Sequence, residues 1–228
     1  MLCSLTATAQ TNEQTTSRWS FYPRVGINFS KFAGDKIYIS TGDGEGDTQM
    51  KSKFKMGYTL GAEAEYMFNE SIGVSAGLLY QLEGSDSKGL TVYTSNNNQK
   101  THYGYKFNNQ TLSLPVLLVL PINNTPLKFK IGLQPSYLLN AQLKSTEETY
   151  VKDTRGNWKG VQAESGSWKD NCNSWFNRVA LSVPIGASCN LGNLQLDVRY
   201  NVGLTHIYKY TQDNVRANSI QILLGYQL

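Results

Sequence analysis

Side chains between Leu60 and Tyr80 alternate between apolar residues and polar or small ones, in the stretch LGAEAEYMFNESIGVSAGLLY. The pair Asn69-Glu70 interrupts the alternation once. A period of two is typical of a β-strand with one apolar face, because successive side chains of a strand point to opposite faces. The stretch therefore predicts two antiparallel strands joined by a very short turn.

The same alternation recurs in eight segments of the chain. They are residues 20–32, 54–68, 71–83, 105–120, 127–143, 175–188, 194–207 and 218–228. The connections after the second, fourth and sixth segments are short, and the long connections are residues 33–53, 84–104, 144–174 and 208–217. In an up-and-down meander this order puts the short turns and both termini at one end and the long loops at the other. An even strand number with that asymmetry is typical of barrels in bacterial outer membranes. The sequence predicts a closed eight-stranded antiparallel up-and-down transmembrane β-barrel.

The distribution of glycine indicates which face of the strands meets lipid. Mid-strand glycines share the parity of the charged residues; they are Gly26, Gly57, Gly61, Gly73, Gly77, Gly132, Gly186, Gly203 and Gly225. Glycine weakens a strand by about 0.5–1 kcal/mol relative to alanine, so a water-facing surface gives no reason to gather it on one face. The narrow interior of an eight-stranded barrel does give one, because small residues make room for charged side chains. We therefore expect the polar face inside. The alternative is a soluble lipocalin-like ligand-binding barrel with the faces reversed.

Six charged residues of the polar parity are the candidate ion pairs of the lumen. They are Arg24, Arg178 and Arg199 as cations, and Glu63, Glu65 and Asp197 as anions. Removing charges from water is costly unless they are paired. Side chains also fill a barrel of this size. We expect a plugged lumen and no porin activity.

The first residues predict three parts of the chain. Ala7-Thr8-Ala9 before Gln10 fits a signal-peptidase site, so residues 1–9 read as a truncated signal peptide that includes Cys3. Residues 10–19 form a polar spacer, and residues 20–228 form the barrel domain. Cys172 and Cys189 flank one predicted strand, too far apart for a disulfide, and read as free thiols.

The sequence offers little chemistry beyond the barrel. The net charge of +4 is scattered, which gives no footprint for nucleic acid. The loop TGDGEGDTQM resembles the start of a calcium loop but has Thr48 and Phe54 where glycine and glutamate are needed, so we expect no metal and no cofactor. His206 with Ser219 and Asp213 leaves open an outer-membrane lipid-modifying hydrolase.

Two tryptophans of the third long connection, Trp158 and Trp168, lie too far from the strands to belong to a membrane-interface girdle. They could bind a glycan or a partner protein, or pack the loop against itself. They are the candidate binding residues of the loops.

Four stretches, YPRVGINFSKF, GYTLGAEAEYMFNESIGVSAGLLYQLEG, LSLPVLLVLP and IQILLGYQL, together resemble the PorT-type outer-membrane β-barrel family of Gram-negative bacteria. The resemblance implies an integral outer-membrane protein with no enzyme activity, inserted by the barrel-assembly machinery. The chain departs from the usual aromatic last residue, since Leu228 follows Tyr226 by two positions.

We therefore expect a non-enzymatic outer-membrane protein whose termini are periplasmic. It would contact membrane lipid and lipopolysaccharide, and its role would be structural or would lie in binding an envelope protein or surface ligand through its outer loops.

Overall fold

The computed structural model describes residues 18–34, 37–39, 48–50, 52–87, 90–93, 98–209 and 214–228. Almost all regular structure in this part of the chain is β. The strands are β1 Trp19–Ala33, β2 Ile37–Ile39, β3 Thr48–Met50, β4 Ser52–Lys53, β5 Lys55–Met67, β6 Gly73–Ser87, β7 Leu90–Tyr93, β8 Gln99–Ser113, β9 Val116–Pro121, β10 Leu127–Lys152, β11 Trp158–Asn171, β12 Val179–Leu191, β13 Leu194–Gly203 and β14 Arg216–Tyr226, with a single 3-10 turn at Asn173–Trp175. No helix among the described residues is long and apolar enough to cross a membrane.

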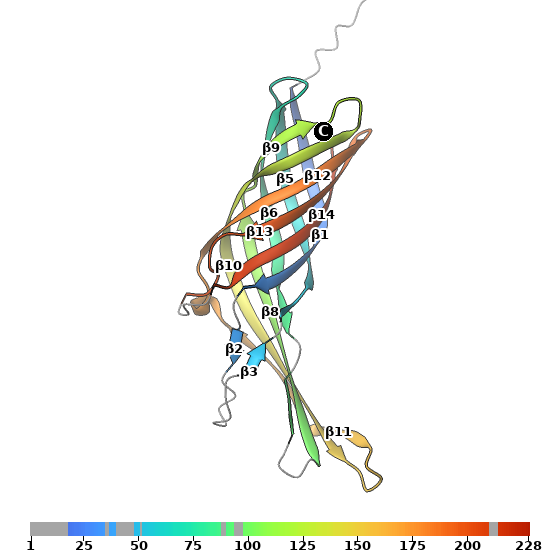
Figure 1. The fold of residues 1–228 in the computed structure, drawn as a ribbon, viewed down its shortest axis with the longest axis vertical. Helices are drawn as coiled ribbons and strands as arrows, with labels where there is room; N and C mark the ends of the chain where they lie inside the picture. The colour runs from blue at the N-terminus through green and yellow to red at the C-terminus, as the bar shows by residue number, and fades with distance from the viewer. Residues whose placement is uncertain are drawn as a thin grey trace, which may run out of the picture.

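The main strands pair antiparallel in a ring (Figure 1). Its members are β1, β5, β6, the β8–β9 strand, β10, β12, β13 and β14. The last member pairs with the first in continuous register, with Val25 opposite Leu224. We refer to these strands as the ring and to the space they enclose as its interior.

The two ends of the ring differ. The backbone N–H of Met67 donates to the carbonyl of Arg18 at 2.9 Å, and that of Leu228 to the carbonyl of Phe21 at 3.0 Å, so the start and end of the described chain share the end that carries the short turns. The described strands of the long connections, such as β2, β3 and β11, lie beyond the opposite end (Figure 1). We call the first the turn end and the second the loop end.

Two connections that were expected to be loops, 84–104 and 144–174, contain strands instead. β10 has 26 residues, more than twice the roughly 9–11 that cross a bilayer, so it continues far beyond the ring. There it pairs with β8 on one side and β11 on the other, and β7 pairs with β8. These four strands form a sheet that extends from the loop end, which we call the outer sheet (Figure 1).

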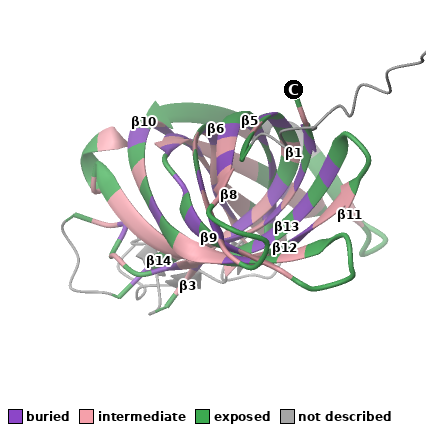
Figure 2. Ribbon diagram, turned by 90° about the horizontal axis from the view of Figure 1, so that it is seen from above, coloured by how far each residue is buried: buried purple, intermediate pink, exposed green. Residues whose placement is uncertain are grey.

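The ring is apolar outside and largely polar inside. Along β1, Arg24 is 3% exposed and its neighbour Val25 is 52% exposed. Buried and exposed residues alternate in this way along the ring strands (Figure 2). This arrangement excludes the soluble lipocalin-like alternative, because a water-soluble barrel needs the apolar face inside. The interior is not wholly polar, since Leu79, Leu117 and Leu223 are also fully buried there.

Three prolines lie in or beside the ring strands, where a proline removes one donor of the backbone ladder. Pro115 lies in the break between β8 and β9. Pro135 and Pro184 instead lie inside β10 and β12, in regular register opposite Leu181 and Asn201. Each proline lacks only its own backbone N–H donor. The carbonyl of Pro135 still accepts a hydrogen bond from the backbone N–H of Leu114 at 2.9 Å.

Candidate functional site in the ring interior and the outer sheet

A cluster of charged side chains fills the interior toward the turn end. It comprises Arg24 from β1, Glu63 and Glu65 from β5, Lys128 and Lys130 from β10, and Asp197 and Arg199 from β13. The inward parity of these positions places all seven on the same side of the sheet. We call this cluster the ion-pair network.

Arg199 is the centre of the network. Its guanidinium contacts both carboxylate oxygens of Glu63, with Nη1–Oε1 at 2.5 Å and Nη2–Oε2 at 2.8 Å. Its Nε also donates to Asp197 Oδ1 at 2.7 Å. Arg24 Nη2 reaches the same Glu63 at 2.9 Å. The side chains of these residues are essentially inaccessible to solvent, and each buried charge is matched by at least one opposite charge.

Lysines of β10 complete the network. Lys130 Nζ lies 3.0 Å from Asp197 Oδ2 and 3.3 Å from Glu65 Oε2. Lys128 pairs with the other oxygen of Glu65. The network therefore bridges strands that do not pair with each other, from β10 across to β5 and β13.

Five of the six charges proposed from the sequence meet in this network, and the sixth does not. Arg178 is exposed at the start of β12, where its Nη1 donates to the carbonyls of Leu138 and Leu139 at 3.2 and 3.4 Å. Its parity was read from a strand that was expected to begin at 175, whereas β12 begins at Val179. Sequence reasoning passed over Lys128 and Lys130 as partners, although their alternation in the stretch LKFKI placed them on the polar face.

Glycines lie directly opposite several members of the network on neighbouring strands. Gly77 is paired with Glu63, Gly225 with Arg24 and Gly186 with Arg199. A Cβ at Gly77 would lie 2.4 Å from Glu63 Cγ, and one at Gly225 would lie 2.5 Å from Arg24 Nη1. The small residues thus provide space for the charged side chains.

An apolar cluster lies at the loop end of the ring. It consists of Phe32, Phe107, Leu138, Ala141, Leu143, Cys172, Phe176, Ile207 and Val215, with Tyr208 packed against it. The Phe176 and Tyr208 rings stack with centroids 5.0 Å apart, and the Phe32 and Phe107 centroids are 5.5 Å apart. Burial raises the pKa of the Cys172 thiol to about 11 and also raises the pKa of Tyr208. We call this cluster the apolar cap.

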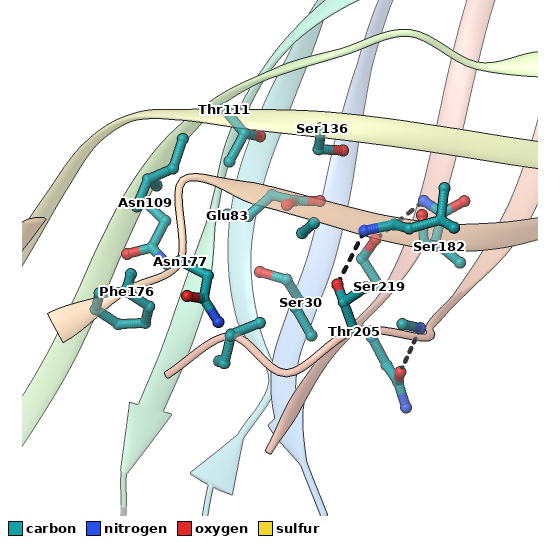
Figure 3. A pocket seen from close by; sticks show the side chains of 18 of the residues that line it. Ser30, Glu83, Asn109, Thr111, Ser136, Phe176, Asn177, Ser182, Thr205 and Ser219 are labelled. Atoms are coloured by element: carbon teal, nitrogen blue, oxygen red, sulfur yellow. Dashed lines mark hydrogen bonds between the residues drawn. The ribbon is translucent and has the colours of Figure 1, made fainter. Parts of the chain in front are cut away.

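Between the ion-pair network and the apolar cap lies a polar chamber with a volume of about 70 Å³ (Figure 3). Hydroxyl, amide and carboxyl side chains line it, including Ser30, Glu83, Asn109, Thr111 and Ser219. The sequence analysis did not single out any of these side chains, because isolated serines and amides carry no spacing signal.

The outer sheet carries an aromatic and cationic face near its tip. Lys100 Nζ lies 4.5 Å from the ring centroid of Trp158 and 5.3 Å from that of Tyr150. Lys152 Nζ lies 5.1 Å from the Trp158 ring, and Tyr93 makes an edge contact with the same ring at 6.3 Å. Cross-strand pairing sets the arrangement, because Lys100 is opposite both Tyr93 and Tyr150. We call these five residues the tip face.

Trp158 and Trp168 therefore occupy different environments. Trp158 is half-buried in the tip face, whereas Trp168 is 52% exposed, nearer the ring, and lies over Gly166. Packing of the loop against itself, the alternative to partner binding for both residues, thus describes Trp158 better than Trp168.

The residues of the hydrolase alternative are not brought together. His206 is exposed, whereas Ser219 is buried inside the ring and accepts a hydrogen bond from Asn201 at 3.0 Å. Asp213 and the acidic residues of the loop TGDGEGDTQM, for which no metal was expected, lie outside the described residues. Within the described residues, no group of three or more His, Cys, Asp or Glu is placed to hold a metal ion. Cys172 and Cys189 are free thiols, as predicted.

Comparison with known proteins agrees with this architecture. Residues 8–209 match the model of the family described as outer membrane protein beta-barrel domain. The chain belongs to this outer-membrane β-barrel family. Its members are integral outer-membrane proteins, and the antiparallel barrel fold and the membrane location expected from the sequence are thereby confirmed. The matched family is broader than the PorT-type family, so membership of the PorT type stays a prediction.

Solved structures of outer-membrane proteins show similar folds. Ail, the attachment invasion locus protein of Yersinia pestis, has 14% identity and a TM-score of 0.40, with 92% of this chain and 98% of Ail covered. NspA, a neisserial surface protein, has 13% identity and a TM-score of 0.38, with coverages of 91% and 97%. OprG of Pseudomonas aeruginosa has 12% identity and a TM-score of 0.35, with coverages of 93% and 97%. No curated protein matches the chain.

Proposed function

We propose that this protein is a non-enzymatic, closed eight-stranded barrel of the PorT type that displays its outer sheet on the cell surface. Both termini would then be periplasmic, because the first and last described residues lie at the turn end. The continuous pairing of β14 with β1 supports closure, since a strand edge left open in lipid would expose unpaired backbone groups. The strand β14 and the apolar Leu228 would present the chain to the barrel-assembly machinery.

The interior of the barrel would not conduct solutes. The ion-pair network occupies one part of it and the apolar cap another. Side chains of an eight-stranded barrel fill its cross-section, and here both layers are tightly packed. A structural role in the envelope, in contact with membrane lipid and lipopolysaccharide, needs no more than this scaffold.

The tip face is the observation that favours a binding role in addition. Lys100 and Lys152 each lie over an aromatic ring and form no ion pair with a described residue. Two ammonium groups beside Trp158 and Tyr93 offer charge to an anion and flat apolar surface to a sugar or aromatic ring. The partner we infer is an anionic surface ligand, such as a sulfated or phosphorylated glycan.

Binding of a multiply charged sugar to the refolded protein tests the proposal. Sucrose octasulfate is a suitable probe because its charge is high and its size is small. Replacing Lys100 and Lys152 by alanine together should weaken its affinity about tenfold or more, and added salt should weaken binding to the natural protein.

The matched control replaces Lys106 and Lys169 by alanine. These residues lie on the same sheet, away from Trp158, and the change removes the same total charge. Equal losses of affinity in the two double variants would mean that net charge alone accounts for binding. That result would overturn the assignment of the tip face. Liposome swelling by small sugars would separately overturn the closed interior.

A further inference from the structure

The polar chamber between the ion-pair network and the apolar cap has an unusual balance of hydrogen-bonding groups. Four of its lining residues are more than nine-tenths buried and have a side-chain oxygen with no hydrogen-bond partner. These atoms are Asn109 Oδ1, Thr111 Oγ1, Gln134 Oε1 and Asn201 Oδ1. Among the described lining residues, none of the buried unpartnered atoms is a nitrogen.

A carboxylate adds charge to these oxygens. Glu83 extends into the same chamber as Asn109 and Thr111 (Figure 3). It forms no ion pair with a described residue, and its side-chain neighbour is the Ser219 hydroxyl. The ammonium of Lys55 interacts electrostatically with Glu83, but its Nζ donates to the backbone carbonyl of Glu83 at 3.0 Å and does not line the chamber.

Other charges near the chamber are directed away from it. Arg178 lines the rim, where its guanidinium donates to two backbone carbonyls and is exposed to solvent. The members of the ion-pair network form ion pairs with one another toward the turn end. The chamber itself therefore presents one carboxylate beside hydroxyl and amide groups, with apolar side chains such as Phe32 and Leu138 toward the apolar cap.

We propose that the chamber binds a monovalent inorganic cation, of the Na⁺ or K⁺ class, with Glu83 as the charged ligand and the four buried oxygens among the neutral ones. Neutral oxygens can replace the hydration shell of such an ion, as carbonyl groups do in selective channels. Leaving buried acceptors unsatisfied would cost about 1–3 kcal/mol each, so an occupant that offers only positive charge is favoured.

Other occupants fit the chamber less well. A divalent ion such as Ca²⁺ is commonly held by several carboxylates, and here there is only one. An anion would be repelled by the carboxylate of Glu83 and by the partial negative charge of the unpartnered oxygens. Water alone also fits the volume, because a buried water needs little space and two to four polar partners. The test must therefore distinguish bound water from a bound cation.

Thermal unfolding of the refolded protein in detergent micelles provides the test. Samples contain NaCl, KCl, CaCl₂ or N-methyl-D-glucamine chloride at equal ionic strength, the last being too bulky for the chamber. A bound ion several-fold above its dissociation constant should raise the unfolding midpoint by about 2–4 °C relative to N-methyl-D-glucamine. The rise should disappear in Glu83→Gln and persist in Glu70→Gln, a control in an exposed turn.

Two results would overturn the site. Equal midpoints in all salts would mean that the chamber holds water only. A rise that survives in Glu83→Gln, or that only CaCl₂ produces, would place the ion elsewhere on the protein. Should Glu83→Gln fail to refold, crystals of the natural chain soaked in Tl⁺ decide, since an anomalous peak beside Glu83 is expected and its absence refutes the site.

Discussion

Arg199 and Glu63 form a two-contact ion pair across the interior of the barrel, at 2.5 and 2.8 Å, although 136 residues separate them in the sequence. The guanidinium fork matches both oxygens of the carboxylate, which is the strongest geometry for such a pair. The pair joins β5 to β13, two strands that share no backbone hydrogen bonds. It therefore acts as a crosslink between walls of the barrel.

Removing Glu63 should destabilise the protein strongly. Glu63→Ala leaves Arg24 and Arg199 with only Asp197 as a close anionic partner, and an uncompensated buried charge costs about 3–5 kcal/mol. Urea unfolding in lipid vesicles, followed by the mobility shift between folded and unfolded protein on gels, measures the change. Lys159→Ala, which removes the exposed partner of Asp153, should have little effect.

Replacing both members of the pair should cost less than replacing one. In Glu63→Met with Arg199→Met, the two charges leave together and apolar volume takes their place. We expect the double variant to be more stable than Glu63→Ala in the same urea assay. A double variant as unstable as Glu63→Ala would contradict this expectation. It would mean that the remaining charges, Asp197 and Arg24, need Arg199 for their own stabilisation.

Adding one methyl group at Gly77 should disturb the same site. The new Cβ would lie 2.4 Å from Glu63 Cγ and 2.5 Å from the carbonyl oxygen of Ala62, so the strands must shift. Overpacking of this kind costs about 1–3 kcal/mol, to be measured as a lower urea midpoint for Gly77→Ala. Gly160→Ala in the outer sheet is the control, because its nearest neighbour, Tyr150 Cε1, is 3.7 Å away. Equal midpoints for both variants would contradict the role of the glycine.

Cys172 should resist alkylation while the barrel is folded. The thiol is fully buried and its pKa is raised to about 11, so little thiolate exists near neutral pH, and the thiolate fraction grows only as the pH rises toward that value. Maleimide labelling of a variant in which serine replaces Cys3 and Cys189 measures this directly. Rapid labelling in urea and none in vesicles is the expected outcome. Rapid labelling in vesicles would show that the apolar cap opens readily.

Surface labelling in cells should report the orientation of the barrel. Arg155 lies in the exposed turn between β10 and β11, and Glu70 in the turn between β5 and β6. A membrane-impermeant maleimide should label Arg155→Cys in intact cells and Glu70→Cys only after permeabilisation. The reverse pattern would place the outer sheet in the periplasm and refute surface display.

The sequence predicted the barrel strands well because each has one face that is uniformly apolar. The expected segment 20–32 differs from β1 by one residue at each end, and 54–68 differs from β5 to the same extent. The rule that glycines share the charged face also pointed to the neighbourhood of Glu63 and Arg24. A two-residue period and side-chain size were sufficient for these inferences.

Features that depend on contacts between distant strands were not predictable. The outer sheet was missed because the stretch TEETYVK is polar on both faces, so its pairing with β8 leaves no hydrophobic pattern. The apolar cap was missed because Phe32, Phe107 and Phe176 come from three parts of the chain that are far apart in the sequence: β1, β8 and the segment before β12. Arg178 was misplaced because its strand was expected to begin at residue 175, whereas β12 begins at Val179, so Arg178 lies outside the strand, where alternation no longer directs a side chain inward.

Neutralisation of Glu63 requires arginines from β1 and β13, the early and late parts of the chain. A half-built sheet that contained β5 but not yet β13 would carry a carboxylate without its two-contact partner Arg199. We therefore expect insertion and seam formation between β1 and β14 to be energetically linked, with few stable partly inserted intermediates in the bilayer.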